Sequence, residues 1–294
     1  MLYRRQKILL SLIEEFGGTL KSTDLQKYLF LLSIRQQEKS YHFVPYRYGC
    51  FSFQAYQDKR NLTGKGFLLS TDDWKLTGKR NLRGTLPLQD AHDIWQTKKD
   101  FGHLSGEQLV KYVYEKYPYY AVNSEIATKV LSRERFLEVE KQRPSKAEQA
   151  LCSIGYEGKS LEEYLNILIK EDIKILCDVR KNPISRKYGF SKKTLMNATE
   201  KLGIEYLHCP DLGIESDKRR ELVTQADYDT LFEVYEKTVL KESIQSIKML
   251  NGLLESKKRI AVTCYEKLPQ QCHRTRVANA ILQEGIGQTK FIEV

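Results

Sequence analysis

The first eighty residues carry apolar positions at helical spacing, interrupted by glycines and polar turns. Residues 3–16 show this pattern and stop at Gly17, whose backbone freedom suits the end of a helix. A second helix is predicted to begin at Ser22 or Thr23 and a third at Ser52, because serine and threonine side chains cap free backbone N–H groups. Residues 67–76 read as two short strands around an Asp-Asp turn. Three small helices followed by a hairpin predict a winged-helix-like domain.

A polar segment then separates the two halves of the chain. Ser105 is predicted to cap a helix that ends near Pro118. Residues 132–149 are polar and charged with few apolar positions, which is typical of a boundary between domains. We therefore predict a smaller, mainly helical domain over residues 1–147 and a second domain over residues 148–294.

The second half alternates short apolar runs with amphipathic segments. The runs are predicted as strands over residues 151–155, 173–179, 204–208, 259–264 and 290–294. Helical patterns fill the intervals, with one long or two shorter helices between residues 226 and 255. This alternation predicts an α/β fold with a mostly parallel sheet and helices on both faces. Ligands in such sheets bind beyond the carboxyl ends of the strands.

The composition is that of a folded protein. Of the 294 residues, 41% are hydrophobic and 29% charged, which supplies apolar material for one large or two ordinary cores. No apolar run approaches the roughly 18 to 20 residues that cross a bilayer, so no membrane contact and a cytoplasmic location are expected. The six cysteines are scattered and no secretory signal is evident, so they are expected to stay reduced.

The charge is distributed unevenly. The net charge is +10, and residues 1–150 hold 25 Lys and Arg against 17 Asp and Glu, a balance of +8. This excess favours a nucleic-acid partner, with DNA favoured over RNA, and a basic surface without a partner is the alternative. Helical modules of this kind also mediate self-association, so a homodimer stays open. The candidate nucleic-acid contacts are Arg47, Lys59, Arg60, Lys65 and Lys75.

Polar and ionisable side chains gather where the predicted strands end. These ends share one edge of a parallel sheet, the edge at which ligands bind. The catalytic candidates are Tyr156, Glu157, Asp178, Cys264, Glu266 and His273. The candidates for binding substrate or phosphate are Arg180, Ser185, Arg186, Lys267 and Arg274.

Each of these residue types has a chemical rationale. Guanidinium forks suit phosphate or carboxylate recognition. Asp178 either acts as a general base or stabiliser, or pairs with an arginine to shape the loop. Cys264 precedes a loop and a helix, an arrangement that lowers a thiol pKa and binds anions. Glu266 and His273 are candidate acid/base groups.

Neither a metal nor a cofactor is expected. His208 and Cys209 would add soft ligands to those near Cys264, but the chain has no C-x-x-C pair. The adjacent residues Cys272 and His273 are also expected to point apart. No Walker-type loop, dinucleotide fingerprint, H-E-x-x-H motif or nucleophile-elbow serine occurs, which disfavours ATP-driven, nicotinamide and zincin chemistry.

Four phrases in the C-terminal half resemble a known family. They cover residues 153–158, 178–186, 206–213, and 264–266 with 272–274. In order and content they are similar to the bacterial family catalogued as domain of unknown function 488, a label that carries no established reaction. The last strand and helix also look like the active-site turn of rhodanese-type sulfurtransferases.

The N-terminal half resembles a different group. Residues 25–30 and 43–52 are similar to the small helical domains of Panacea-type antitoxins. This resemblance implies recognition of a macromolecule rather than catalysis.

Three functions therefore stay open. In the first, the N-terminal domain docks on nucleic acid and the C-terminal domain processes a nucleotide or modified base, as a glycosylase or nuclease does. The second is a rhodanese-like thiol or sulfur transfer through Cys264. The third is a regulator without catalysis, for example in phage defence, that senses a nucleic acid or anionic ligand.

Overall fold

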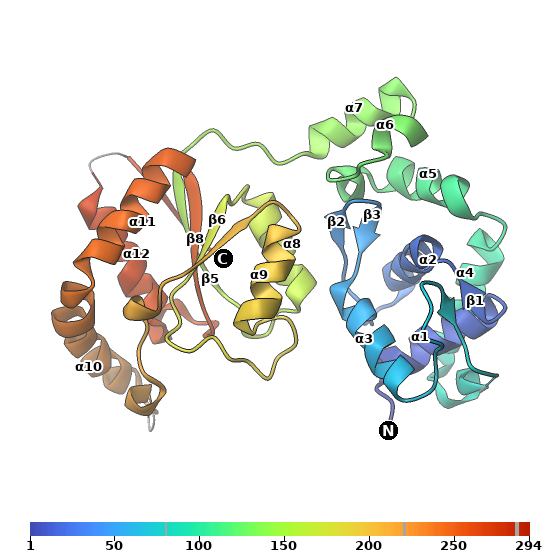
Figure 1. The fold of residues 1–294 in the computed structure, drawn as a ribbon, viewed down its shortest axis with the longest axis horizontal. Helices are drawn as coiled ribbons and strands as arrows, with labels where there is room; N and C mark the ends of the chain where they lie inside the picture. Colours follow the sequence, from blue (N-terminus) through green and yellow to red (C-terminus); the bar gives the residue numbers. More distant parts are fainter. Residues whose placement is uncertain (80, 220–221, 286–287) are drawn as a thin grey trace. The chain divides into compact units, whose positions relative to one another are not determined.

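The computed structural model describes residues 1–79, 81–219, 222–285 and 288–294. The chain divides into two compact units, Met1–Arg143 and Pro144–Val294 (Figure 1). The domain boundary expected from the sequence falls after residue 147, just beyond the end of the first unit at Arg143. Within the described residues, every helix is too short or too polar to traverse a bilayer.

The first part of the N-terminal unit combines short helices with two small antiparallel sheets. Its elements are α1 (Arg4–Glu15), β1 (Thr19–Leu20), α2 (Ser22–Arg35), β2 (Val44–Tyr46), β3 (Gly49–Phe51), α3 (Phe53–Gly64) and β4 (Trp74–Lys75). Ser52 caps α3, since its hydroxyl accepts a hydrogen bond from the Ala55 N–H at 3.2 Å. Residues 67–76 turn back on themselves as expected, since the Leu69 N–H donates to the Lys75 carbonyl, but only Trp74–Lys75 forms a strand, and it pairs with β1.

The remainder of this unit is helical. It comprises α4 (Leu88–Phe101), α5 (Gly106–Lys116), α6 (Ala127–Val130) and α7 (Arg133–Gln142), with short 3₁₀ turns at Leu82–Thr85 and Pro118–Ala121. The sequence prediction missed α4. Residues 133–142, which the sequence analysis treated as part of the polar boundary segment, form a helix of the first unit, because Ser132 caps α7 and Val139 is fully buried in the N-terminal core. Charged residues occupy most positions of α7, so its few apolar residues do not form a recognisable helical pattern in the sequence.

The C-terminal unit is a five-stranded parallel sheet, which confirms the predicted fold class. The strands are β5 (Ala150–Gly155), β6 (Ile175–Asp178), β7 (Glu205–His208), β8 (Arg259–Cys264) and β9 (Lys290–Glu293), in the order β7-β6-β8-β5-β9. The helices are α8 (Leu161–Lys170), α9 (Lys192–Glu200), α10 (Gln225–Tyr235), α11 (Ile244–Lys257) and α12 (His273–Glu284). One π-helical turn, Glu236–Leu240, follows α10, so the long pattern predicted there becomes two helices.

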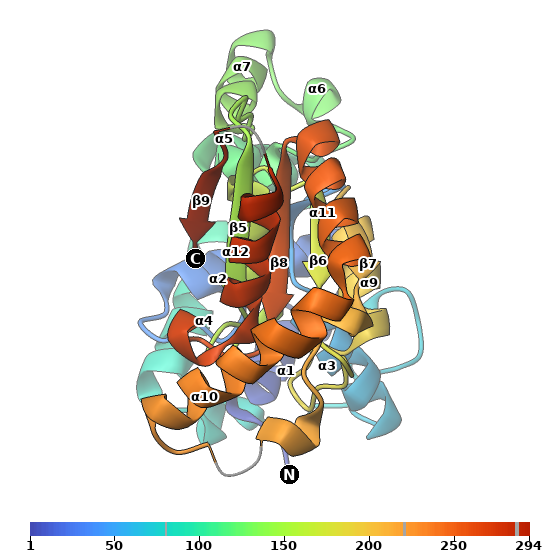
Figure 2. The same cartoon turned by 90° about the vertical axis from the view of Figure 1, so that its left-hand side faces the viewer.

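The helices cover both faces of this sheet. In Figure 1, α8 and α9 lie on one face and α11 and α12 on the other, and Figure 2 shows α12 crossing in front of β5 and β8. Every residue of β5 and β8 is buried, as expected for central parallel strands. The register places Gly155 beside Cys264, and Asp178 beside Thr263 and His208. The chemically active strand ends therefore meet at one edge.

Candidate active site

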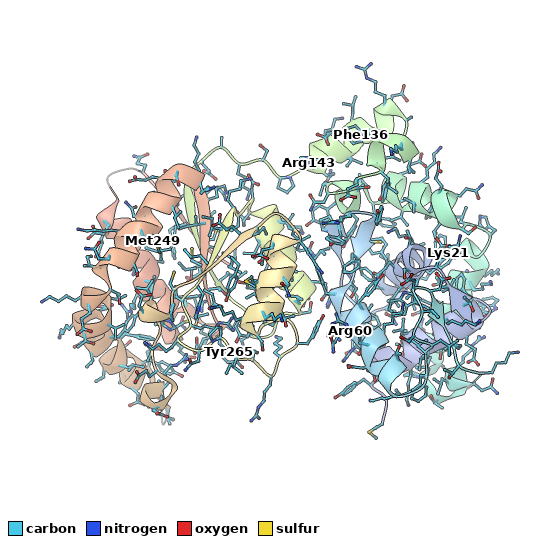
Figure 3. The ribbon with its side chains drawn as sticks, in the orientation of Figure 1. Lys21, Arg60, Phe136, Arg143, Met249 and Tyr265 are labelled. Carbon is cyan, nitrogen blue, oxygen red and sulfur yellow. The ribbon has the colours of Figure 1, made fainter. Side chains whose placement is uncertain are left out.

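A pocket of about 440 Å³ opens at the carboxyl edge of the sheet. It brings together six residues singled out from the sequence: Tyr156, Arg180, Ser185, Arg186, Cys264 and Glu266. It also includes Asn182, Arg219, Tyr228 and Tyr265, which sequence reasoning did not single out. Tyr265 marks this edge in Figure 3 and is 44% exposed. The pocket thus joins guanidinium groups, aromatic rings, a thiol and a carboxylate.

Asp178 and Arg180 form a buried ion pair beneath the pocket. Arg180 Nε donates to Asp178 Oδ1 at 2.8 Å, and Arg180 Nη2 donates to Asp178 Oδ2. The Tyr206 hydroxyl also donates to Asp178 Oδ2. Burial opposes the charge of Arg180, but hydrogen bonding and attraction to Asp178 raise its pKa above the ordinary value. Asp178 is fully buried and does not line the pocket, so its carboxylate positions Arg180, which is the structural alternative considered for this residue.

Arg180 also donates hydrogen bonds that fix the wall of the pocket. Arg180 Nη1 donates to the Tyr156 hydroxyl at 3.0 Å and to the Phe190 carbonyl at 2.8 Å. The Tyr156 ring stacks on Phe190 with centroids 4.2 Å apart and meets Tyr265 edge to face at 5.3 Å. Tyr156 is almost fully buried, whereas Tyr265 is open to solvent. The exposed ring of Tyr265 is therefore available to a planar ligand, whereas that of Tyr156 is not.

Two thiols, an imidazole and a carboxylate form a cluster at the inner end of the pocket. Cys264 Sγ lies 3.2 Å from Glu266 Oε2 and 3.7 Å from His273 Nδ1, and Cys272 Sγ lies 2.9 Å from Glu266 Oε2. The expectation that Cys272 and His273 point apart is wrong. Cys272 has an extended backbone at the N-cap of α12, so the chain turns between the two residues and both side chains face Cys264.

The electrostatics of the cluster favour a shared negative charge. Burial opposes ionisation of Cys264, but the Cys272 thiol, His273 and Arg219 together lower its pKa well below the ordinary value. Burial also disfavours charge on His273, yet the adjacent Cys264 raises the pKa of the imidazole. Burial and the charge of Cys264 raise the pKa of Glu266. Glu266 is thus a carboxyl group suited to hold or release a proton.

Arg219 completes this cluster from a distant part of the sequence. Its Nη1 donates to Glu266 Oε1 at 2.7 Å, across 47 residues of chain. Arg219 ends a 3₁₀ turn, Ser216–Arg219, within a charged stretch of the sequence. No sequence motif distinguishes Arg219 from the charged residues around it. Only the tertiary fold brings its side chain to Glu266.

Three predicted site residues instead support the loop after β8. Arg274 is fully buried, and its guanidinium donates to Ser153 Oγ at 3.0 Å and to the Glu266 carbonyl at 2.6 Å. Its expected role in binding phosphate is therefore corrected to a structural one. Glu157 Oε2 accepts a hydrogen bond from the Lys267 N–H at 2.8 Å, and neither residue lines the pocket.

The loop after β6 supplies the outer wall of the pocket. Ser185 is partly buried, and its hydroxyl accepts a hydrogen bond from the Lys187 N–H at 3.2 Å. Arg186 is exposed at the pocket and available to an anion. Lys187 Nζ donates to the Tyr156 carbonyl at 3.0 Å, which connects the loop to the residue that follows β5.

The basic candidates of the N-terminal unit lie on three elements. Arg60 on α3 (Figure 3), Lys65 after α3 and Lys75 on β4 are exposed. Lys59 differs: its Nζ donates to the carbonyls of Thr71 and Asp72 at 2.9 and 2.7 Å and lies 5.0 Å from the Trp74 ring. Lys59 therefore stabilises the turn that precedes β4.

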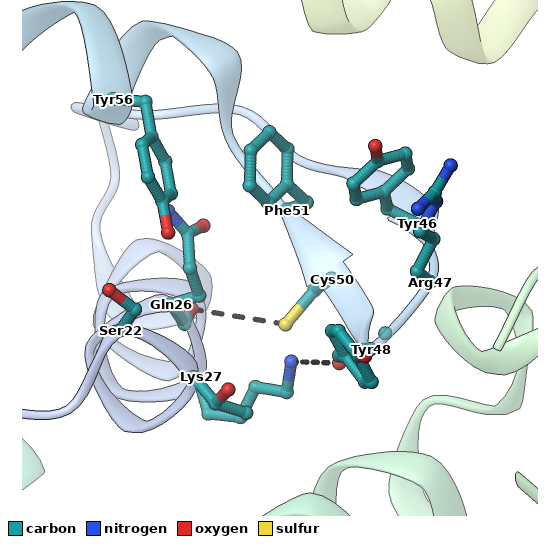
Figure 4. Close-up of a pocket in the computed structure, with 11 residues that line it drawn as sticks. Ser22, Gln26, Lys27, Tyr46, Arg47, Tyr48, Cys50, Phe51 and Tyr56 are labelled. Carbon is teal, nitrogen blue, oxygen red and sulfur yellow. Dashed lines mark hydrogen bonds between the residues drawn. The ribbon is translucent and has the colours of Figure 1, made fainter. Parts of the chain in front are cut away.

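A second pocket, of about 360 Å³, lies beside the β2–β3 hairpin (Figure 4). Arg47 lines it together with Tyr46 and Tyr48. At its base, the buried Lys27 donates to the Tyr48 carbonyl, and burial lowers the pKa of its ammonium. Arg47 is exposed and lies 3.5 Å from the Glu125 carboxylate. This pocket combines aromatic and basic groups at the surface of the N-terminal unit.

Comparisons with known proteins identify one related family. Neither the curated proteins nor the solved structures contain a match to the chain. The resemblance noted for residues 25–52 lies outside the matched region and stays a prediction. Residues 160–281 match the model of the family described as domain of unknown function DUF488, which confirms the resemblance drawn from the motifs of the C-terminal half.

Proposed function

We propose that this protein is an enzyme directed to nucleic acid, in which the N-terminal domain docks on DNA or RNA and the C-terminal domain processes a nucleotide or modified base. One observation carries the proposal: a pocket that combines guanidinium groups and an exposed tyrosine ring with a partly buried carboxyl group. Phosphate recognition, base stacking and proton transfer are the three capacities that such chemistry requires.

The outer part of the pocket suits substrate binding. Arg186 is exposed and can approach a phosphate, while Arg180 is held in place by Asp178. Tyr265 and Tyr228 both line the pocket and offer ring faces to a base. A nucleotide would place its phosphate near the loop after β6 and its base near Tyr265.

The inner part of the pocket suits proton transfer. Glu266 lines the pocket, its side chain is 19% exposed, and its pKa is raised chiefly by burial. A carboxyl group in this state gives a proton to a leaving base or alkoxide, or accepts one from water. Arg219 holds Oε1 of Glu266 and leaves Oε2 directed at the two thiols. Glu266 is therefore the proposed acid/base residue.

The docking surface is assigned to the N-terminal domain. Arg60, Lys65 and Lys75 are exposed on α3, its C-terminal end and β4, and residues 1–150 carry a balance of +8. Helix and hairpin are the elements that a winged helix presents to DNA. We assign Lys59 to the support of this surface rather than to direct contact, because two backbone carbonyls occupy its ammonium group.

Binding of the full chain to duplex DNA should depend steeply on salt. If six or more phosphates are contacted, the affinity falls by about three orders of magnitude or more between 50 and 200 mM salt. Fluorescence anisotropy at several salt concentrations gives the slope. Replacing Arg60 and Lys75 with alanine should reduce the slope by about two, since each removes roughly one phosphate contact.

Lys141 supplies the matched control for this measurement. It is an exposed lysine on α7 whose ammonium pairs with Glu138 at 2.7 Å, away from α3 and β4 in the fold. Lys141→Ala should leave the slope within experimental error. A flat salt response of the wild-type protein would contradict the docking role.

Group transfer through the Cys264 sulfur is a second candidate function. The observation in its favour is the 3.7 Å approach of His273 Nδ1 to Cys264 Sγ, an arrangement typical of activated thiols. This function predicts a covalent adduct on Cys264 after incubation with a sulfur donor such as thiosulfate. Intact-mass measurement would detect the adduct in the wild-type chain and its loss in Cys264→Ser. Absence of the adduct leaves the nucleic-acid function as the better account.

A further inference from the structure

The cluster at the inner end of the pocket has the composition of a metal site. Cys264 Sγ, Cys272 Sγ and a ring nitrogen of His273 all lie within 4.8 Å of one another, and all three residues are buried. Among the residues that the structure describes, this is the one group of three or more potential ligands so close together. Two thiolates and an imidazole are the ligands that zinc and related soft divalent ions prefer.

The separation of Cys264 and His273 fits an ion bound between them. Zinc binds sulfur at about 2.3 Å and nitrogen at about 2.0 to 2.1 Å, so neighbouring ligand atoms of a tetrahedral site lie roughly 3.5 to 3.8 Å apart. The distance from Cys264 Sγ to His273 Nδ1 is 3.7 Å. Glu266 Oε2 lies 3.2 and 2.9 Å from the two sulfurs, next to the position of a fourth ligand.

The surroundings of His273 prepare it for coordination. Its Nε2 lies 2.9 Å from the Val179 carbonyl, so this nitrogen carries the proton and Nδ1 presents its lone pair to the cluster. A ligand histidine almost always donates its second N–H to a carbonyl or carboxylate in this way. A divalent cation and the Arg219 guanidinium would together balance two thiolates and the Glu266 carboxylate.

We propose that Cys264, Cys272 and His273 bind a zinc-class divalent cation, whose fourth position faces the pocket beside Glu266. This inference deepens the proposed function and rests on it for the role of the ion. With the cation bound, the site would activate a water, whose oxygen would form the new bond to the substrate while Glu266 takes its proton. Glu266 would then give that proton to the leaving group as its bond to the substrate breaks, so the reaction would be hydrolysis.

Metal content and cobalt spectroscopy test the inference. The untagged full-length protein, purified without chelator and analysed by mass spectrometry of its metals, should hold about one zinc per chain. Exchange of zinc for Co²⁺ should produce a sulfur-to-cobalt charge-transfer band and the intense visible bands of tetrahedral cobalt. Both signals should be lost in Cys264→Ser, and Cys272→Ser should weaken zinc affinity more than tenfold.

Control variants separate loss of the ligand from loss of the fold. Cys152→Ser removes a buried thiol on β5 that lies outside the cluster and should retain the ion. Circular dichroism should give the same spectrum for every variant that is scored. A folded wild-type chain that takes up neither zinc nor cobalt would overturn the inference, as would a disulfide between Cys264 and Cys272 in its intact mass.

The metal inference and the proposed function fail separately. Binding of nucleic acid to the chelator-treated protein is measured in parallel by fluorescence anisotropy. Salt-sensitive binding without a metal site would overturn the inference alone. One tightly bound zinc without any binding of nucleic acid would overturn the proposed function and retain the metal site.

Discussion

Asp178→Ala is expected to destabilise the C-terminal domain by about 3 to 5 kcal/mol. The Arg180 side chain is 5% exposed and Asp178 is fully buried, so the substitution leaves a buried guanidinium without its counter-ion. It also removes the acceptor of the Tyr206 hydroxyl. Breaking a buried ion pair from one side costs this much because the remaining charge is neither solvated nor paired.

The two domains allow this effect to be measured with an internal reference. Both tryptophans, Trp74 and Trp95, lie in the N-terminal unit, so their fluorescence in urea reports the unfolding of that unit. Far-ultraviolet circular dichroism reports both units. Asp178→Ala should lower the urea midpoint of the transition that circular dichroism detects and fluorescence does not. The midpoint of the fluorescence transition should stay unchanged.

A matched control uses an ion pair at the surface. Glu233 on α10 pairs at 3.6 Å with Lys237 of the following π-helical turn, and both side chains are more than 70% exposed. Glu233→Ala should change stability by less than about 0.5 kcal/mol, because solvent screens such a pair. A loss below about 1 kcal/mol for Asp178→Ala would contradict the structural role of the buried pair.

Glu266→Gln is expected to reduce turnover of a nucleic-acid substrate by about 10²- to 10⁴-fold, the usual contribution of a general acid or base. The amide has nearly the same shape and still accepts a hydrogen bond from Arg219. It cannot take up or release the proton. Affinity for nucleic acid should change by less than about threefold, because the proposed docking surface lies in the N-terminal domain.

Product formation and binding must both be measured for this variant. Single-turnover assays with labelled oligonucleotides give the rate, and fluorescence anisotropy gives the affinity. Glu200→Gln makes the same chemical change on an exposed carboxylate at the end of α9 and should retain the wild-type rate. Equal rates for Glu266→Gln and the wild-type protein would remove Glu266 from the catalytic role.

The sequence predicts the C-terminal sheet well because parallel strands are continuous apolar runs. β5 and β8 are buried along their whole length, and their ends carry the residues that line the pocket. The order β7-β6-β8-β5-β9 is not predictable in the same way, since it depends on which helices pack on which face. α4 and α7 were not predicted, because charged residues lie between their apolar residues and obscure the helical spacing.

The chemistry of the site was predicted less completely than its position. Arg219 lies in a charged stretch and reaches Glu266 only through the fold. Arg274 belongs to the last motif, but the fold buries it against Ser153 and the loop carbonyls. Cys272 and His273 were expected to diverge, and the extended backbone at the start of α12 brings them together. In each case the outcome depends on tertiary contacts that residue types alone do not specify.

The central claim is that docking by the N-terminal domain delivers a nucleic acid to the pocket that contains Glu266. The most direct test incubates the full-length protein with labelled DNA and RNA under conditions of salt-sensitive binding and analyses the products for released bases and broken strands. The claim predicts a changed product with the wild-type protein and an unchanged one with Glu266→Gln, although both bind. Binding without any product from the wild-type protein, with every candidate substrate class, would contradict catalysis and favour the regulator without catalysis.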